Sequence, residues 1–277
     1  MTHGIHRNLA AGDYHAIDAV SASRLQLLHR SPAHMRWAID HPDDVDTEAF
    51  KFGRAFHCSI LEPDVFAATW AIEPKIDRRT NAGKAAALAF EADNAGKEII
   101  GSNDYAACLA MAETVKSHPM ASWLVANKQD IEVSALWQDA ATGLECRSRA
   151  DAIVPKVKTI IDLKTTTDAS PDEFERSLYK WGYHRQAAFY LDGFKACGMD
   201  VRRFAFVAVE KKPPYAVCVY QIDDEAIEYG RRENRSLMNL YAQCRTNNKW
   251  PGYPDQVQTV GLPSWAIKQL ESMMEAV

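Results

Sequence analysis

The chain has 277 residues, 47% of them hydrophobic and 25% charged, which is the composition of an ordinary globular protein with one large domain or two small ones. No apolar run approaches the roughly 18 residues that a bilayer span needs, so we expect no membrane partner. The net charge of −5 argues against a surface that coats nucleic acid everywhere, but it is compatible with a local basic channel beside an acidic metal site.

The start of the chain lacks the basic and apolar regions of a secretory signal peptide. The six cysteines are scattered without a CxxC pair, which indicates neither a zinc site nor a disulfide framework. We therefore expect a reducing, cytoplasmic setting.

Residues 1–125 read as mainly helical. Apolar residues recur at three- and four-residue spacing, with Ser, Thr or Asn near each start, in the segments 21–31, 47–63, 84–100 and 103–118. Between them, PKIDRRTNAGK (74–84) combines Gly and Pro with four cationic residues and predicts an exposed loop.

Residues 126–277 begin with strands. Alternating and β-branched patterns predict a three-strand meander over 131–139, 144–154 and 159–165, with AATG and PKVK as its turns. A helix should follow over 170–181, with Ser170 as its cap, Pro171 at its first position and Glu173 completing a capping box.

The rest of the chain alternates between both kinds of element. We expect a helix closing at Gly198, two further strands, a long helix and a final segment, at 183–198, 202–210, 215–222, 223–247 and 262–277. A strand reached through a helical crossover is usually parallel to the one it left. The order predicts one α/β domain over residues 1–277, with a mixed sheet flanked by helices and an N-terminal helical part.

The segment IIDLKTTT (160–167) ends a buried strand in charged residues. Side chains alternate along a strand, so Asp162 and Lys164 share one face while Leu163 points to the core on the other. A hairpin turn centred between residues 156 and 157 places Asp151 opposite Asp162, and Arg149 opposite Lys164.

Two facing carboxylates repel each other unless a cation neutralises them. Oxygen ligands with open coordination positions suit Mg²⁺ or Mn²⁺, and a neighbouring lysine supplies positive charge to a phosphoryl transition state. The pattern therefore indicates a site for hydrolysing phosphodiesters. A surface salt-bridge cluster explains the same residues equally well, and the pair alone does not decide between the two.

The wider set of motifs resembles the exonuclease VIII (RecE) family of phage-type recombination exonucleases, RecB-like members of the PD-(D/E)XK nuclease superfamily. The similarity runs from about residue 13 to the WPGY and LPSW segments near the end of the chain. Its motifs are GRAFHCSILEP (53–63), DRRTNAGK (77–84), RSRADAIV (147–154), IIDLKTT (160–166) and YHRQAAFYLDG (183–193).

This resemblance implies roles for individual residues. The implied metal ligands are His57, Asp151, Asp162 and the Leu163 backbone carbonyl, with Lys164 as the catalytic lysine. Gln186 and Tyr190 fit a Q-x-x-x-Y motif that contacts the site or the DNA strand. Arg78, Arg79 and Lys84 would bind phosphates of the DNA backbone.

Each of these residues also has a structural interpretation. A lone histidine in an apolar helix is more often a satisfied core or surface residue, and the basic loop can simply be solvated. For Tyr183, on the same helix face as Gln186 and Tyr190, we favour packing.

The family further implies a Mg²⁺-dependent exonuclease that degrades one strand of duplex DNA from its 5′ end and leaves 3′ tails for recombination. It implies a single-strand annealing partner of the RecT type and a homotetramer. The alternatives are an endonuclease or single-strand DNase on the same fold, and an inactive DNA-binding scaffold. A Schiff-base enzyme is disfavoured because neighbouring carboxylates raise the pKa of Lys164.

Overall fold

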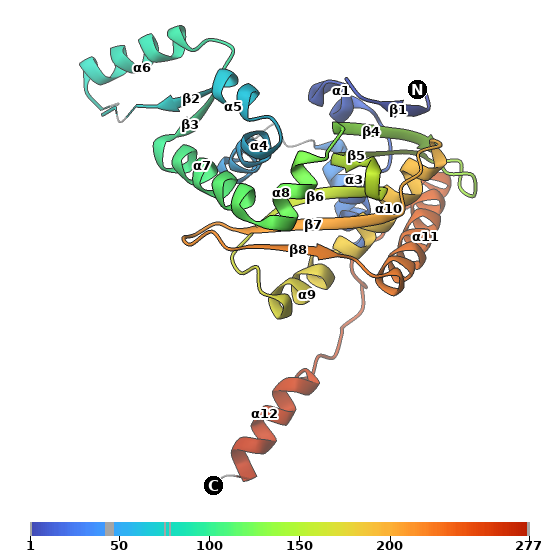
Figure 1. Cartoon of the computed structure of the whole chain (residues 1–277). Helices are drawn as coiled ribbons and strands as arrows, with labels where there is room; N and C mark the ends of the chain where they lie inside the picture. Colours follow the sequence, from blue (N-terminus) through green and yellow to red (C-terminus); the bar gives the residue numbers. More distant parts are fainter. Residues whose placement is uncertain (1, 42–46, 75, 78, 276–277) are drawn as a thin grey trace.

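The computed structural model describes residues 2–41, 47–74, 76–77 and 79–275, and its centre is a six-stranded sheet (Figure 1). In spatial order the strands are β1 (Gly4–His6), β4 (Asp130–Gln138), β5 (Glu145–Val154), β6 (Thr159–Thr166), β7 (Arg203–Glu210) and β8 (Val217–Gln221). Neighbours are antiparallel except for β6 and β7, which are parallel because two helices form the crossover between them. The predicted mixed sheet, with its meander and helical crossover, is confirmed.

Helices cover both faces of this sheet (Figure 1). The N-terminal helices are α1 (Ala11–Ala16), α2 (Ala22–Arg30), α3 (Pro32–Asp40), α4 (Glu48–Leu61), α5 (Pro63–Thr69), α6 (Asn81–Asp93), α7 (Ser102–Ser117) and α8 (Pro119–Ala126). After the meander come α9 (Pro171–Lys180), α10 (Tyr183–Ala196), α11 (Asp224–Asn247) and α12 (Ser264–Glu275). None of the described helices is both long enough and apolar enough to cross a membrane.

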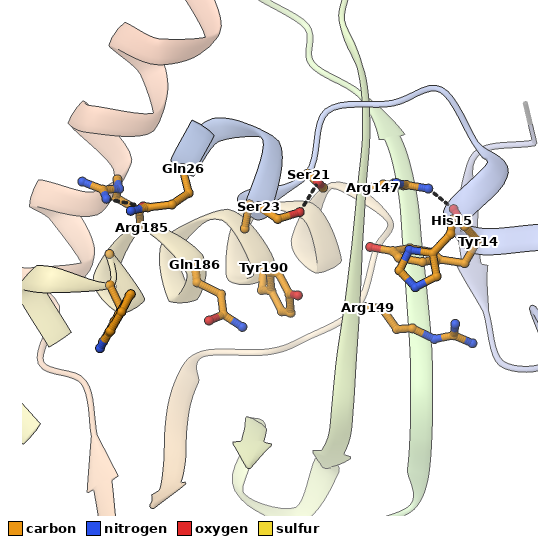
Figure 2. A pocket seen from close by; sticks show the side chains of 13 residues that line it. Tyr14, His15, Ser21, Ser23, Gln26, Arg147, Arg149, Arg185, Gln186 and Tyr190 are labelled. Atoms are coloured by element: carbon orange, nitrogen blue, oxygen red, sulfur yellow. Dashed lines mark hydrogen bonds between the residues drawn. The ribbon is translucent and has the colours of Figure 1, made fainter. Parts of the chain in front are cut away.

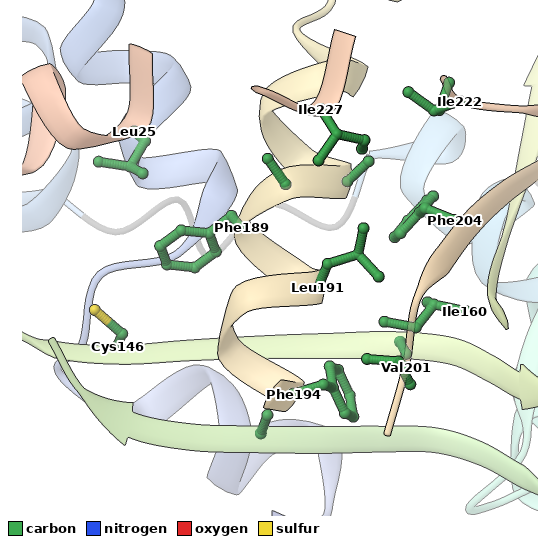
Figure 3. Packing of buried hydrophobic residues seen from close by; sticks show 14 of the residues in the cluster. Leu25, Cys146, Ile160, Phe189, Leu191, Phe194, Val201, Phe204, Ile222 and Ile227 are labelled. Atoms are coloured by element: carbon green, nitrogen blue, oxygen red, sulfur yellow. The ribbon is translucent and has the colours of Figure 1, made fainter. Parts of the chain in front are cut away.

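Successive residues of β6 belong to two different hydrophobic clusters. Ile160 packs in the cluster under α10 and α11, whereas Ile161 and Leu163 pack in the cluster under α4 and α7. Figure 3 shows the first cluster, in which Phe189 and Phe194 project from α10 beside the strands. Burial on both faces explains why this strand has apolar residues at the successive positions 160 and 161 instead of at alternate positions only.

The connection between β5 and β6 has the predicted register. Residues 155–157 form one short 3₁₀ turn, and Lys158 continues it in a left-handed conformation with φ 53°. The ladder pairs Val154 with Thr159 and Ala152 with Ile161, as the hairpin predicted. The sequence pattern therefore located both the turn and the pairing of the strands that carry the charged residues.

One predicted helix is too long. The segment predicted over 84–100 is helical only up to Asp93, and the chain turns through Gly96 at φ 85°. Strand β3 (Glu98–Gly101) then pairs in parallel with β2 (Trp70–Glu73) in a small separate sheet. Ile100 is buried in this arrangement, so its burial in a strand outweighs helix propensity at the end of the segment.

The predicted loop 74–84 is shorter than expected. Helix α6 already begins at Asn81, because the Thr80 hydroxyl accepts a hydrogen bond from the Gly83 N–H over 2.9 Å. A Cβ atom at Gly83 would lie 2.0 Å from the Asp77 carbonyl oxygen, so this close turn requires glycine.

The predicted capping box at the start of α9 is wrong, although the helix begins at Pro171 as expected. The Ser170 side chain makes no capping hydrogen bond. Its backbone N–H donates to Asp168 Oδ1 over 2.7 Å, and Glu173 pairs with Arg176. The local Asp168 turn replaces the expected reciprocal cap.

Candidate active site

The charged end of IIDLKTTT lies where β5 and β6 stop pairing. Beyond the Ala152–Ile161 pair, the backbone N–H of Leu163 donates to Asp151 Oδ2 over 2.7 Å. The two strands separate here, so the predicted direct pairings of Asp151 with Asp162 and of Arg149 with Lys164 are both wrong. The two acids remain close enough for the charge of Asp162 to raise the pKa of Asp151. Arg149 Nε lies 3.0 Å from Glu132 Oε2 on β4 instead.

Asp162 and Lys164 project together from β6 into the space beside α10. Lys164 Nζ lies 2.7 Å from Asp162 Oδ2, and Gln186 Nε2 donates to Asp162 Oδ1 over 2.5 Å. The Asp162 residue is only 3% exposed. Its Oδ2 is paired with the lysine ammonium, and a carboxylate oxygen so paired still has a second lone pair that a cation can use.

His57 approaches the same place from α4. Its Nε2 lies 3.1 Å from the Leu163 carbonyl oxygen, and its Nδ1 lies 3.5 Å from Asp151 Oδ2. Burial lowers the pKa of His57, which favours the neutral imidazole that binds metals. His57 lines a cavity together with Glu62, Glu132 and Arg149. Gly53, one turn earlier on α4, lines this cavity too, and a Cβ there would meet nothing within 4 Å.

Glu132 is a candidate ligand that the sequence analysis left unassigned. Potential ligand atoms of His57, Glu132 and Asp151 all lie within 4.8 Å of one another. The flanking pairs of β4 and β5, Ile131 with Ala152 and Val133 with Ala150, place Glu132 across from Asp151. Extending the meander register to β4 is the signal that would have found it.

The backbone at Glu132 is unusual for a strand residue. Its φ of 50° lies in the left-handed region, which a non-glycine residue adopts at an energetic cost. Arg149 Nε donates to the Glu132 carbonyl oxygen over 3.1 Å and also pairs with its carboxylate. The same arginine thus holds both the strained backbone and the side chain of Glu132.

Negative charge is concentrated in this cluster. Burial, and then the charge of Asp162, raise the pKa of Asp151 well above its usual value. Burial, and then Asp151, raise the pKa of Glu132 to about 7. Burial disfavours the charged Lys164, but Asp162 and Asp151 outweigh it and the pKa of Lys164 is raised.

These residues fit a divalent cation. Imidazole nitrogen, carboxylate oxygens and the Leu163 carbonyl form a mixed donor set that hard and borderline cations accept. A bound cation would also offset the repulsion between Asp151 and Asp162, which contributes to the raised pKa of Asp151.

Helix α10 brings Tyr183, Gln186 and Tyr190 to the side of the sheet on which Asp162 and Lys164 lie. Gln186 holds Asp162, and burial strongly raises the pKa of Tyr190. Tyr183 packs against Phe206, as predicted, and its ring centroid also lies 4.9 Å from Lys164 Nζ. That cation–π contact is a link to the site which helix spacing alone did not indicate.

The basic segment 77–84, which was predicted to bind DNA phosphates, does not lie at this cluster in its described part. Arg79 is almost fully exposed, and its guanidinium pairs with Asp77, with Nε 2.9 Å from Oδ1. Lys84 is exposed on α6, which Figure 1 shows at the far end of the N-terminal helical part. Arg78 lies outside the described residues. A DNA-binding role for these residues stays a prediction.

Two solved structures are similar to this chain, and the alignment with the first supports the fold. A "putative exonuclease" from Eubacterium rectale aligns with a TM-score of 0.60 and 13% identity over 95% of this chain and 98% of that one. A phage-related exonuclease from Haemophilus somnus 129PT aligns with a TM-score of 0.33 and 17% identity over 70% of this chain and 94% of that one. No curated protein in the comparison matches the chain.

A family model, "PDDEXK-like domain of unknown function (DUF3799)", matches residues 21–263. This span includes His57, Asp151, Asp162, Lys164 and the α10 motif. The resemblance to PD-(D/E)XK nucleases predicted from the motifs is confirmed, and the chain belongs to this PDDEXK-like family.

Proposed function

We propose that the chain is a metal-dependent exodeoxyribonuclease that degrades one strand of linear double-stranded DNA. The observation that carries the proposal is the position of Lys164. Its ammonium lies 2.7 Å from the Asp162 carboxylate. The second acid, Asp151, accepts a hydrogen bond from the Leu163 N–H and lies 3.5 Å from His57 Nδ1. The lysine therefore belongs to a cluster with a histidine and an excess of negative charge. A divalent cation and a lysine at one point together stabilise the negative charge that develops during phosphodiester hydrolysis.

In this mechanism Asp151, Asp162, His57 and the Leu163 carbonyl would hold Mg²⁺, with Glu132 as a further candidate ligand and Mn²⁺ as a substitute. The bound cation supplies Lewis-acid polarisation of the scissile phosphate. Lys164 stays protonated because of its carboxylate neighbours, and it orients the attacking water or stabilises charge on the phosphate. Gln186 keeps the Asp162 carboxylate in place through its 2.5 Å hydrogen bond.

The finer features of the proposal come from resemblance to the exonuclease VIII family. They are degradation from the 5′ end, 3′ single-stranded tails used in homologous recombination, a RecT-type annealing partner and a homotetramer. The chain would act in the cytoplasm of a bacterial or phage-infected cell as a single nuclease domain. Residues 1–125 would contribute His57 to the strands that follow.

The test uses linear duplex DNA labelled at the 5′ or the 3′ end, with a closed circle as control, in Mg²⁺ or Mn²⁺. Wild type is compared with Lys164→Ala, Asp162→Ala and the matched control Lys195→Ala, which changes an exposed lysine of α10. We expect mononucleotides from the 5′ end, an intact circle, and activity lost only in the two site variants.

Other results would indicate a different function. A cut circle would indicate an endonuclease, and degradation of single strands alone would indicate a single-strand DNase. DNA binding without cleavage in either metal would indicate a scaffold. Equal activity of wild type and Lys164→Ala would exclude the proposed site.

A further inference from the structure

A cavity of about 390 Å³ adjoins the candidate active site. Its volume lies within the about 300–1,000 Å³ range of small-ligand sites. The walls come from α1, α2, β5 and α10 with the turn that precedes it. Figure 2 shows Gln186 and Tyr190 extending from α10 on one side, with Tyr14, His15 and Arg149 on the other. Because Gln186 also holds Asp162, a ligand in this cavity would lie next to the proposed metal ligands.

The cavity is strongly cationic. Arg147, Arg149 and Arg185 line it, and no acidic side chain does so among the described residues. Arg149 pairs with Glu132, and Arg185 pairs with Glu233 at 2.5 Å. In the described part of the chain Arg147 has no carboxylate within ion-pair distance, and its buried Nε has no hydrogen-bond partner. Its guanidinium is held by the Tyr14 carbonyl and lies 4.7 Å from the Tyr14 ring centroid, so its positive charge would gain from a negatively charged ligand in the cavity.

Other groups in the cavity agree with an anionic ligand. Burial, and then the charges of Arg147 and Arg149, lower the pKa of His15, so the local potential is positive. The hydroxyls of Ser21 and Ser23 lie 2.9 Å apart on the same wall, and because one proton forms the hydrogen bond between them, the other hydroxyl can donate to a phosphate.

An exposed tryptophan stands at the rim. Trp181, at the end of α9, lines the cavity and is 54% exposed. Lys180 Nζ lies 4.8 Å from its ring centroid. A large aromatic ring exposed beside a cationic groove is the combination that single-stranded nucleic acids use for stacking and backbone contacts.

We propose that this cavity binds one nucleotide of the DNA strand entering the site, with its phosphate among the arginines and its base against Trp181. The proposal rests on the proposed nuclease function for the identity of the ligand. It adds a binding site separate from the metal ligands, and it explains how the strand could be positioned while the next phosphodiester lies near Asp162.

The test measures binding without cleavage. Short single-stranded oligonucleotides, with either a 5′-phosphate or a 5′-hydroxyl and a fluorophore at the 3′ end, are titrated in EDTA and followed by anisotropy. The variants are Trp181→Ala, Trp181→Phe and Gln26→Glu. Gln26 accepts a 2.5 Å hydrogen bond from Arg185, so glutamate keeps that contact and adds one negative charge to the cavity. Arg147 is unsuitable because its guanidinium also donates to the Tyr14 carbonyl.

Matched controls are Trp265→Ala, an exposed tryptophan on α12, and Gln221→Glu, the same charge change at the exposed end of β8. We expect Trp181→Ala and Gln26→Glu to weaken binding about tenfold or more, Trp181→Phe to restore most of the affinity, and both controls to bind as wild type. A 5′-phosphate preference that Gln26→Glu abolishes would assign the cavity to a terminal phosphate. Equal binding of both oligonucleotides would assign it to an internal phosphodiester.

Wild-type affinity in both Trp181→Ala and Gln26→Glu would overturn the proposal, whether or not the protein cleaves DNA. Conversely, weakened binding in a protein that cleaves no DNA would keep this site and reject the nuclease function. Cleavage by wild type with unaltered binding in both variants would keep the nuclease and reject the nucleotide site.

Discussion

The backbone N–H of Leu163 donates to the carboxylate of Asp151 over 2.7 Å. On the other side of the same residue, the Leu163 carbonyl oxygen lies 3.1 Å from His57 Nε2. One core leucine, whose side chain is buried, therefore holds both the first acid and the histidine of the proposed metal site through its backbone. Side-chain substitution at Leu163 cannot remove these two backbone contacts, whereas substitution of Asp151 or His57 can.

Asp151→Asn should stabilise the metal-free protein. Asp151 and Asp162 carry two negative charges beside a single lysine, and an asparagine oxygen can still accept the Leu163 N–H. In EDTA at pH 8 we expect Tm to rise by about 2–4 °C, the shift that about 1 kcal/mol produces in a larger domain. Differential scanning calorimetry measures this change.

The pH dependence follows from the raised pKa of Asp151. The folded state keeps a proton that the unfolded state releases, so wild-type stability falls as pH rises from the ordinary range of an aspartate through the raised value. The advantage of Asp151→Asn should accordingly shrink at acidic pH. Saturating Mn²⁺ should reverse the order, because wild type binds the cation more tightly and therefore gains more stability. A variant less stable than wild type in EDTA at pH 8 would contradict the excess of charge.

Glu132→Gln should weaken metal binding. Glu132 lies within 4.8 Å of the ligand atoms of His57 and Asp151, and its amide counterpart is a poorer ligand for a hard cation. We expect about a tenfold or larger increase in the Mn²⁺ dissociation constant by titration calorimetry. Glu62→Gln is the matched control, because Glu62 lines the same cavity outside this ligand group. Equal Mn²⁺ affinity in both variants would remove Glu132 from the metal site.

Gln186→Ala should act through Asp162. The substitution removes the 2.5 Å donor to Asp162 Oδ1 and leaves Lys164 as the one described partner that orients this carboxylate. We expect a 10- to 100-fold loss of kcat and a higher Mn²⁺ concentration for half-maximal cleavage, as loss of a hydrogen bond to a metal ligand causes. Exposed Gln221→Ala is the control. If only KM for DNA rose, with unchanged metal dependence, Gln186 would be a DNA contact instead.

Local sequence pattern was sufficient for the strands that carry the acids. The β6 residues alternate between two buried clusters, and the turn before β6 is short, so periodicity located both the strand and its register. The same argument failed at Arg149, because β5 and β6 separate beyond Ala152. Side chains such as Asp151, which replace the hydrogen bonds of the ladder, decide where the two strands separate. Hydrophobic periodicity does not indicate this position.

The remaining site features depend on contacts between distant segments. Glu132 reaches the cluster because β4 pairs with β5 and because its own backbone has a left-handed φ of 50°. The sequence gives no sign of this conformation, since the residue is not a glycine. The cationic cavity unites Arg147, Trp181 and residues of α1 and α2 that lie far apart in the chain. Short elements such as β1 and α1 also escaped prediction, since three to six residues are too few for a period to be recognised.

Two glycine-to-alanine substitutions in helices should have opposite effects. At Gly193 of α10, a Cβ atom would lie 2.4 Å from the Trp137 ring of β4, inside a core where both residues are buried. At Gly53 of α4 it would meet nothing within 4 Å. Gly193→Ala should cost about 1–3 kcal/mol by overpacking, whereas Gly53→Ala should gain about 0.5–1 kcal/mol from helix propensity.

Denaturant unfolding in EDTA compares the two variants with wild type at constant m-value. Because Gly53 lines the cavity beside His57, the two alanines also separate stability from function. Gly193→Ala should retain its Mn²⁺ affinity while folded, and any loss of cleavage should follow the unfolded fraction. Gly53→Ala should keep or exceed wild-type stability, so a change in its Mn²⁺ affinity would come from the narrowed cavity. A stabilising Gly193→Ala would show that α10 can move away from β4, and the fixed position of Gln186 over Asp162 would then lose its support.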